Sequence, residues 1–377
     1  MQRFLVGGAV RDDLLGLPVK DRDWVVIGAT PESMRAAGYK AKDEHFQVYL
    51  DPELSEEHSL ARTERASGPG HRDFTLDFAP TITLPEDLQR RDLTINAIAV
   101  AEDGTFIDPF GGLNDLNAGV LRHVSDAFPE DPLRLFRALR FSAALAQHNF
   151  SFADETFELL KQMAAAKGHQ TLSSSRIWQE TLRALNTPTP SAFIRPLYQL
   201  KLYQYGFNTL TELRCEAPDQ FERALLAVDI AVSEPTQRLA SIACAHQGLL
   251  GSAPKQLRDH YPYSKISRRE QEFVQTTFNL ASALASHPMT ANNILQAMEK
   301  ADARRHSERF QLSLDLLNDL SKHAAFTHIS GEAVEQLRRA QSAITSIDVR
   351  PLREIYASEE LGNAIRERQL ETITKIL

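Results

Sequence analysis

The stretch LVGGAVRD, residues 5–12, joins a short apolar run to a pair of glycines and then to residues that favour a helix. Glycines at such a junction let the backbone approach a triphosphate closely. The N-terminus of the following helix and Arg11 would supply positive potential. The stretch therefore predicts a triphosphate site at Gly7, Gly8 and Arg11, although Gly-Gly pairs are also common in turns.

A second motif, DRDWVV at residues 21–26, places Asp21 and Asp23 two positions apart at the start of an apolar strand. Side chains two apart in a strand lie on one face, so both carboxylates can hold Mg²⁺ ions. In a two-metal site one ion activates the attacking 3′-hydroxyl and the other neutralises the departing pyrophosphate. A solvated Asp-x-Asp turn is the alternative for this motif alone, but its position after the glycines favours a metal site.

Short runs rich in Val, Ile and aromatic residues predict strands only in the first part of the chain. The predicted strands are Phe4–Val6, Trp24–Ile27, Phe46–Leu50 and Ile95–Val100, with a helix over Ala9–Leu15. From about residue 121 the pattern becomes helical, and no clear β-run follows residue 125. An α/β head followed by an all-helical body is the simplest architecture that fits.

The composition is that of a globular protein large enough for two or three domains. Of 377 residues, 42% are hydrophobic and 24% are charged. Cys215 and Cys244 lack metal-ligand spacing, and no apolar run approaches the roughly 20 residues of a membrane helix. The first residues reach glycine and charge too early for a secretory signal. We therefore expect a cytoplasmic protein without a membrane segment.

The net charge of −8 argues against an RNA partner unless positive charge is gathered locally. Candidate clusters are Arg134, Arg137 and Arg140, then residues 265–269, and then residues 304–309. Each of these clusters also fits a solvated helix face, so composition alone leans away from RNA.

The segment RRDLTINA, residues 90–97, carries further groups suited to a nucleotide. Arg91 can clamp a phosphate through two donors, and Asp92 or Asn96 can bond ribose hydroxyls. A structural arrangement, with Asp92 as a cap and Arg91 ion-paired, fits equally well. The turn-rich segment DPFGGLNDL, residues 108–116, then predicts a linker or hinge where strands give way to helices.

The segment EDPLR, residues 130–134, opens a helix that also carries Arg137 and Arg140. Asp131 is an acceptor and Arg134 a donor three positions away, so the two are neighbours on one helical face. Such a pair can present a Watson–Crick-like edge to a nucleobase. An acid at a helix start with an i,i+3 salt bridge is the alternative.

The motifs at residues 7–12, 21–23, 90–97 and 130–134, in this order and spacing, resemble the signature motifs of class II tRNA nucleotidyltransferases and bacterial poly(A) polymerases. Residues 1 to about 185 are similar almost continuously to the CCA-adding enzymes of gamma-proteobacteria, with further matches at residues 61–65 and 121–125. The resemblance implies an α+β fold class. It implies a polymerase-β-like head with a small mixed or antiparallel sheet (residues 1–120), a helical neck with the nucleotide-recognition helix (121–190), and a helical RNA-binding body and tail (191–377).

The resemblance also implies a reaction, the addition of C, C and A to the 3′ end of tRNA from CTP and ATP with Mg²⁺. In this family amino acids select the nucleotide without a nucleic-acid template. The implied roles are triphosphate binding by Gly7, Gly8 and Arg11, catalysis and metal binding by Asp21 and Asp23, ribose and phosphate contacts by Arg91 and Asp92, and base selection by Asp131 and Arg134 with support from Arg137 and Arg140. The oligomeric state, monomer or homodimer, is left open.

Two further segments resemble the family. Residues 65–71 correspond to a mobile loop associated with the switch from CTP to ATP, which favours full CCA addition. Residues 174–180 correspond to a neck motif that steadies the recognition helix. The alternatives are a poly(A) polymerase, a partial CC-adding or A-adding enzyme, and an RNA-binding protein that has lost catalysis.

The sequence departs from many gamma-proteobacterial relatives in its C-terminal half. Residues 238–248 resemble the remnant of an HD phosphohydrolase domain, but Gln247 stands where that domain has a metal-binding Asp. A neutral amide does not supply the charge that a divalent cation site needs. We therefore expect no phosphohydrolase activity. Residues 301–305 resemble a motif of the family tail, whereas residues 186–300 otherwise match poorly.

Overall fold

The computed structural model describes residues 1–66, 74–205, 210, 218–230, 234–250, 266–285, 289–323, 326 and 328–377. The chain divides into two compact units. The first contains Met1–Thr181 and Gln199–Lys201, and the second contains Leu182–Tyr198 and Leu202–Leu377. No helix in the described ranges is long and apolar enough to span a bilayer.

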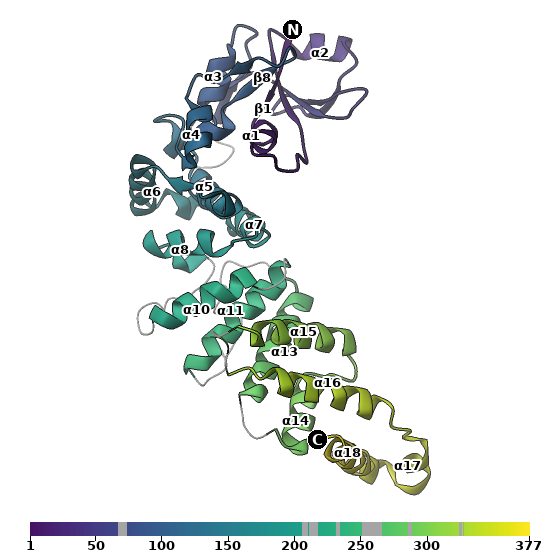
Figure 1. Cartoon of the computed structure of the whole chain (residues 1–377). Helices are drawn as coiled ribbons and strands as arrows, with labels where there is room; N and C mark the ends of the chain where they lie inside the picture. Colours follow the sequence, from purple (N-terminus) through teal and green to yellow (C-terminus); the bar gives the residue numbers. More distant parts are fainter. Residues whose placement is uncertain are drawn as a thin grey trace. The chain divides into compact units, whose positions relative to one another are not determined.

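The first unit begins with a mixed sheet in which β1 and β8 are neighbours (Figure 1). The full strand order is β3-β4-β5-β2-β1-β8-β9. Strand β2 runs parallel to β5, and its other neighbour, β1, is antiparallel to it. A separate hairpin joins β6 to β7. The bounds are β1 Gln2–Val6, β2 Asp23–Ile27, β3 Lys40–Asp43, β4 Val48–Leu50, β5 Glu57–Leu60, β6 Thr63–Ala66, β7 Phe74–Asp77, β8 Ala99–Ala101 and β9 Phe106–Ile107.

Strand β2 shows why the sheet is buried on both faces. Val25 packs into one apolar cluster with Leu88, whereas Val26 packs into another with Met34. Because successive side chains of a strand point to opposite faces, Asp23 belongs to the face of Val25. The sheet therefore aims Asp23 toward the side on which α3 (Leu84–Gln89) packs.

Helices connect and cover the strands of the first unit. Their bounds are α1 Gly8–Leu14, α2 Pro31–Ala36, α4 Gly112–Ala118, α5 Leu133–Ala144, α6 Asp154–Ala166 and α7 Ser174–Leu185, with short 3₁₀ turns η1 Thr94–Asn96, η2 Phe128–Glu130, η3 Ala146–His148 and η4 Gly168–Thr171. Helix α5 buries most of its residues, Arg134 among them, whereas Arg137 and Arg140 are partly exposed. The short strands β10 (Val120–Leu121) and β11 (Ser151–Phe152) pair in parallel.

The predicted α+β fold is confirmed, although strands β3, β5, β6, β7, β9 and β10 were not predicted and three further local features differ. The run Ile95–Val100 is not one strand, because η1 occupies its start and β8 begins only at Ala99. Strand β4 begins at Val48 rather than at Phe46, because Gln47 adopts a positive φ of 49°. Strand β11 lies after residue 125, where no strand was expected, but it is only two residues long.

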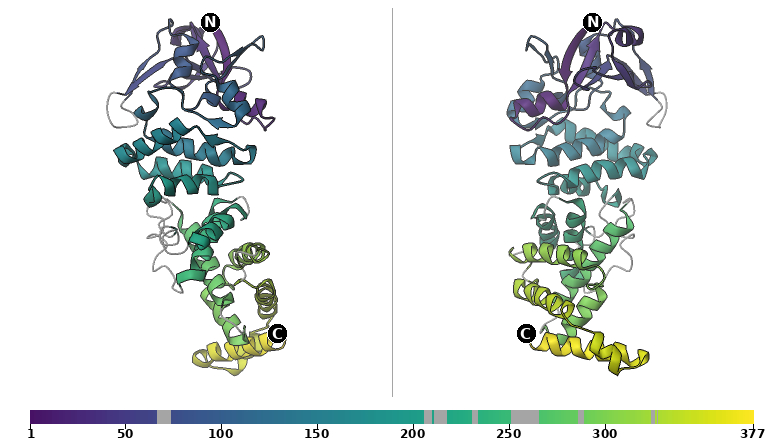
Figure 2. Two further views of the ribbon diagram at one scale, coloured as in Figure 1. Left: turned by 60° about the vertical axis from the view of Figure 1, so that its left-hand side comes forward. Right: turned by 90° about the vertical axis from the view of Figure 1, so that its right-hand side faces the viewer.

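The second unit is helical throughout its described residues (Figure 2, green to yellow). Its α-helices are α8 Ser191–Gln199, α10 Pro218–Ile230, α11 Pro235–Leu250, α13 Arg268–Leu284, α14 Ala291–Lys300, α15 Ser307–Ser321, α16 Gly331–Thr345, α17 Arg350–Ile355 and α18 Ser358–Thr374, and η5 Tyr203–Tyr205 is a 3₁₀ turn. The division between units falls inside α7, and the finer boundaries at residues 120 and 190 stay a prediction.

Candidate functional site

A cavity of about 490 Å³ lies in the first unit and collects residues from all four sequence motifs. Motifs that are far apart along the chain meet there because β1, β2, the segment after α3, and α5 all border it. Of the predicted site residues it is lined by Gly7, Gly8, Arg11, Asp23, Arg91, Asp92, Asp131, Arg134 and Arg137. Asp21 and Arg140 do not line it.

Gly7 and Gly8 of the glycine junction line the cavity. Gly7 has a φ of +76°, a conformation that side-chain-bearing residues rarely adopt, and a Cβ there would lie 3.2 Å from Nη1 of Arg91. Arg11 is held from two sides, since its Nη1 donates to Asn96 (2.7 Å) and its Nη2 to Asp12 (2.7 Å). The glycine junction and a fixed Arg11 guanidinium thus lie together at the cavity, and their predicted triphosphate role stays a prediction.

Of the two predicted metal-binding carboxylates, Asp23 lines the same cavity as the glycine junction and Asp21 does not. Asp23 begins β2 and pairs in register with Glu57 of β5, whereas Asp21 lies before the strand; both residues are exposed. Partial burial raises the pKa of Asp23; Arg91 opposes this effect, and the charges of Glu57 and Asp21 add to it. A site of concentrated negative charge and oxygen donors is suited to a hard divalent cation.

The carboxylates of Asp21 and Asp23 fit an Mg²⁺ ion that is bound partly by the protein and partly by the substrate. In the described part of the chain no group of three or more His, Cys, Asp or Glu side chains is placed to enclose a metal. Mg²⁺ is usually held by one or two carboxylates plus substrate phosphates, rather than by an all-protein cage. Asp21 and Asp23 beside a phosphate cradle match that requirement.

Asp92 joins two walls of the cavity. Its carboxylate accepts hydrogen bonds from Nη2 of Arg137 (2.6 Å) and from Nδ2 of Asn96 (2.9 Å), and Asn96 in turn accepts from Arg11. Burial alone would raise the pKa of Asp92. The Arg137 charge and the hydrogen bonds from Asn96, Arg137 and Leu93 outweigh burial and hold that pKa far below its usual range. Asp92 is thus an ionised link between Arg137 and Arg11, and its predicted ribose contact stays a prediction.

Asp131 and Arg134 both face the cavity, and each has partners elsewhere. Oδ1 of Asp131 accepts from the N–H of Leu133 (3.0 Å), which caps the start of α5. Arg134 donates through Nη1 to the carbonyl of Ala127 (3.0 Å) and through Nη2 to that of Arg90 (2.5 Å). Main-chain carbonyls therefore fix the Arg134 guanidinium, so this arrangement differs from the simple i,i+3 salt bridge that the sequence left open.

Side chains of α7 contact α5 and a residue that precedes its start. Nε of Arg140 donates to Oε2 of the buried Glu180 (2.6 Å). Nη2 of Arg176 lies 3.9 Å from Oδ2 of Asp131. The Arg140 guanidinium also lies over the ring of Phe141, 4.0 Å from its centroid. Residues 174–180 thus contact α5 and the residues at its start, and their predicted steadying role stays a prediction. The nucleotide contacts predicted for Arg140 and the metal role of Asp21 stay predictions.

Sequence reasoning missed several residues that line the cavity. Arg62 and Glu64 border it next to Arg90, although residues 61–65 had been noted only as a match outside the catalytic motifs. Only the family resemblance could have pointed to Arg62 and Glu64, because a short charged strand has no distinctive sequence pattern. Residues 67–71 of the expected mobile loop, and the side chains of His246 and Gln247, lie outside the described residues.

Comparisons with known proteins agree with this geometry. Residues 3–122 match the poly A polymerase head domain, and residues 149–213 match the probable RNA and SrmB-binding site of polymerase A. The multifunctional CCA protein of Pseudomonas putida is 39% identical over 376 residues, 99% of this chain and 98% of that protein. The chain belongs to the family of CCA-adding enzymes. These are tRNA nucleotidyltransferases, a group that uses a divalent metal.

Other CCA-adding proteins extend the comparison. The multifunctional CCA protein of Hahella chejuensis is 53% identical over 213 residues, a match that spans 56% of this chain and 50% of that protein. The Bacillus stearothermophilus CCA-adding enzyme, solved in complex with CTP, has a TM-score of 0.66 at 24% identity, covering 99% of this chain and 89% of that one. This structure shares the CCA-adding fold from the head through the helical domains.

Proposed function

We propose that the chain adds C, C and A in turn to the 3′ end of tRNA, with CTP and ATP as nucleotide donors and Mg²⁺ as the metal. The observation that carries this proposal is one cavity, lined by the glycine cradle, Asp23 and the Asp131–Arg134 pair, in a member of the CCA-adding family. We place the reaction in the cytoplasm, where tRNA, CTP and ATP are available.

The first step is binding of the triphosphate. Gly7 and Gly8 let the backbone approach the phosphates, and Arg11 and Arg91 supply charge-assisted donors. Because Asn96 and Asp12 already hold Arg11, little side-chain freedom is lost when the nucleotide binds. This preorganisation places the α-phosphorus for in-line attack by the 3′-hydroxyl of tRNA.

Asp21 and Asp23 would hold the metal together with the phosphates of the nucleotide. Bound Mg²⁺ supplies Lewis-acid activation of the 3′-hydroxyl and neutralises charge on the pyrophosphate. Glu57, opposite Asp23 in the sheet, adds negative potential that favours the cation. The protein's own part is to hold Asp23 at the start of β2 beside the phosphate cradle, with Asp21 two residues before it.

Selection of the base falls to Asp131 and Arg134. Their acceptor and donor groups can pair with the Watson–Crick edge of cytosine or adenine, and Arg137 lines the same cavity. A site built to hydrogen-bond an edge rejects a base that leaves buried polar groups unpaired. The residues that hold Arg134 in place therefore matter for fidelity as much as Arg134 itself.

The product lengths test this function. Transcripts of tRNA that end at the discriminator base, at C and at CC are incubated with Mg²⁺ and CTP, ATP or both. Stepwise growth that stops after C, C and A is expected. Long adenosine ladders would mean a poly(A) polymerase, a stop at CC a partial enzyme, and no extension an RNA-binding protein without catalysis.

A further inference from the structure

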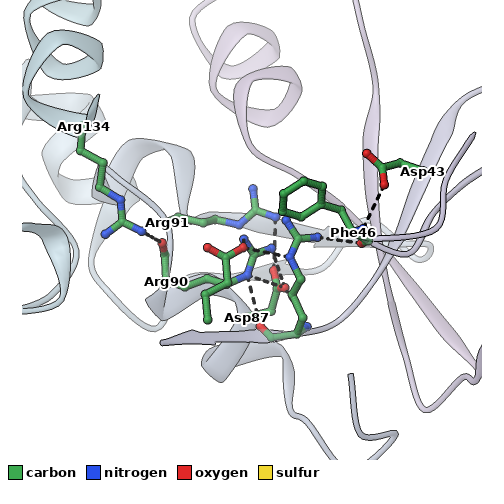
Figure 3. Close-up of polar contacts among 8 residues, drawn as sticks. Asp43, Phe46, Asp87, Arg90, Arg91 and Arg134 are labelled. Carbon is green, nitrogen blue, oxygen red and sulfur yellow. Dashed lines mark hydrogen bonds and ion pairs between the residues drawn. The ribbon is translucent and has the colours of Figure 1, made fainter. Parts of the chain in front are cut away.

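A buried ion cluster lies beside the nucleotide cavity, and its centre is Asp87 on α3 (Figure 3). The cluster contains Arg62, Glu64, Asp87, Arg90 and Arg91. Asp87 is fully buried, does not line the cavity and belongs to none of the predicted site motifs. Its contacts nevertheless involve residues on two sides of the site.

The carboxylate of Asp87 is saturated with donors. Oδ1 accepts from Nη2 (2.8 Å) and Nε (3.1 Å) of Arg90 and from the main-chain N–H of Arg62 (3.2 Å). Oδ2 accepts from Nη2 of Arg91 (3.3 Å). Burial alone would raise the pKa of Asp87, but Arg90, Arg91 and Arg62 outweigh burial and hold it below its usual range, so the group is ionised.

One branch of the cluster reaches the phosphate cradle. Arg91 packs so closely on the glycine junction that a Cβ at Gly7 would lie 3.2 Å from its Nη1. Its Nε is buried and has no partner within the described structure, so Asp87 supplies the directional contact of this guanidinium. The position of Arg91 at the cradle thus depends on Asp87.

The other branch reaches the base-selecting pair. Asp87 and Glu64 together clamp the Arg90 guanidinium, since Nη1 of Arg90 donates to Glu64 (2.7 Å). The carbonyl of the same residue, Arg90, accepts from Nη2 of Arg134 (2.5 Å). A shift of Arg90 would therefore move the main-chain acceptor that helps to orient Arg134.

We propose that Asp87 is a positioning residue for both halves of the nucleotide site: it fixes Arg91 at the triphosphate and, through Arg90, the acceptor that orients Arg134 toward the base. This inference rests on the proposed roles of Arg91 and Arg134. Asp87 itself touches no substrate. Its loss should therefore weaken nucleotide affinity and base selection together, which loss of a single ligand contact would not do.

The test begins with Asp87→Asn, which keeps the side-chain volume but turns one oxygen into a donor that faces an arginine. We expect the KM for CTP and for ATP to rise about tenfold, and the preference for CTP over UTP to fall about tenfold, with a smaller change in kcat. Equilibrium binding of CTP without tRNA should weaken by the same factor as KM rises.

A double-mutant cycle with Arg91→Ala separates this inference from the proposed function. If Asp87 acts through Arg91, the double variant has the same KM as Arg91→Ala alone. An Arg91→Ala enzyme with normal KM would overturn the triphosphate role itself. A raised KM in Arg91→Ala with normal KM and selection in Asp87→Asn would overturn only the positioning role of Asp87.

Two further variants guard against loss of fold. Asp229→Asn removes a half-buried carboxylate that accepts from the N–H (2.9 Å) and Oγ (2.6 Å) of Ser191 in the second unit. It should lower the melting temperature without changing KM or base selection. If Asp87→Asn does not fold, Glu64→Gln loosens Arg90 at a partly exposed site. Reduced base selection is expected there, and unchanged selection would overturn the Arg90 branch.

Discussion

At the scale of single residues, Asp23 is the proposed metal ligand that lines the cavity. It lies at the end of a rigid strand, opposite Glu57 and beside the phosphate cradle. Asp23→Asn keeps the size of the side chain but removes the charge that attracts Mg²⁺. We expect single-turnover addition to fall at least about 10³-fold, whereas tRNA affinity in filter binding stays the same.

The matched control is Glu102→Gln, which changes an exposed carboxylate of the same unit that pairs with Arg3. That variant should add nucleotides at the normal rate. Wild-type activity in Asp23→Asn would remove the carboxylate from the mechanism, and a parallel loss of tRNA binding would point to a damaged fold.

Substitution of Asp131 tests whether a single hydrogen-bond acceptor contributes to base selection. Its Oδ1 caps α5, and the side chain also borders the cavity. Asp131→Ala should reduce the preference for CTP over UTP by about 10- to 100-fold, the factor expected for one charged hydrogen bond. Competition assays with mixed nucleotides measure this ratio. Asp131→Asn, which retains an acceptor oxygen for the Leu133 N–H, separates loss of the cap from loss of the charge.

Asp92 gives the site a defined pH dependence of stability. Its pKa in the folded protein lies well below the unfolded value of about 3.9. Its contribution to stability is therefore complete above about pH 4 and is lost as the pH falls toward the folded pKa. Asp92→Asn should lower the free energy of unfolding at pH 7, and this difference should shrink below about pH 4. Urea unfolding of both proteins at several pH values measures it; a difference constant down to pH 3 would contradict the assignment.

At the scale of elements, side chains of α7 hold α5, the helix proposed to select the base. The Arg140–Glu180 pair joins the two helices, and its side chains are 14% and 3% exposed. Glu180→Gln leaves a buried guanidinium without its countercharge and should cost about 3 kcal/mol in the free energy of unfolding of the first unit. Urea unfolding followed by a probe in that unit gives the value.

An exposed pair provides the comparison for this prediction. Arg195 and Glu222 are 46% and 55% exposed, so Glu222→Gln should change stability by less than about 0.5 kcal/mol. Equal effects of the two substitutions would mean that the Arg140–Glu180 pair is not a structural tie. In that case the predicted nucleotide contact of Arg140 would account better for this arginine.

The elements that could be predicted from sequence are those whose own residues determine them. Strands β1 and β2 and helix α1 follow from apolar runs and a glycine junction. Strand β5 has the sequence EHSL and was not expected, because its stability comes from pairing with β2 and β4 rather than from its own propensity. The run at Ile95 is apolar because it is buried, and its local hydrogen bonds form a 3₁₀ turn instead of a strand.

The site shows the same limit. Motif residues such as Gly7, Asp23 and Arg91 are recognisable because their chemistry requires particular residue types in sequence order. Asp87 gives no such signal, because its importance comes only from three arginines that the fold brings to it. Sequence reasoning therefore finds groups that touch the substrate more readily than groups that hold them.

At the scale of the whole molecule, an acidic chain binds a polyanion, so its positive charge must be concentrated. The net charge is −8, yet the nucleotide cavity is bordered by six arginines within its described lining. The same lining contains four carboxylates, those of Asp23, Glu64, Asp92 and Asp131, so arginines outnumber them there although acidic residues outnumber basic ones in the chain. Overall charge is therefore a poor guide to this kind of partner, because the field of the site decides.

The C-terminal half of the chain leads to a final prediction, that the protein has no metal-dependent phosphohydrolase activity. Gln247 follows His246 at the place where an HD site has its metal-binding Asp, and an amide gives a divalent cation no charge. Purified protein should release no phosphate from a chromogenic phosphate ester with Mg²⁺, Mn²⁺ or Zn²⁺. The Asp23→Asn variant is assayed alongside, because phosphate release that persists without nucleotidyl transfer must come from a second site. Release that persists there, and that disappears in His246→Ala, would show that this half of the chain retains a metal site.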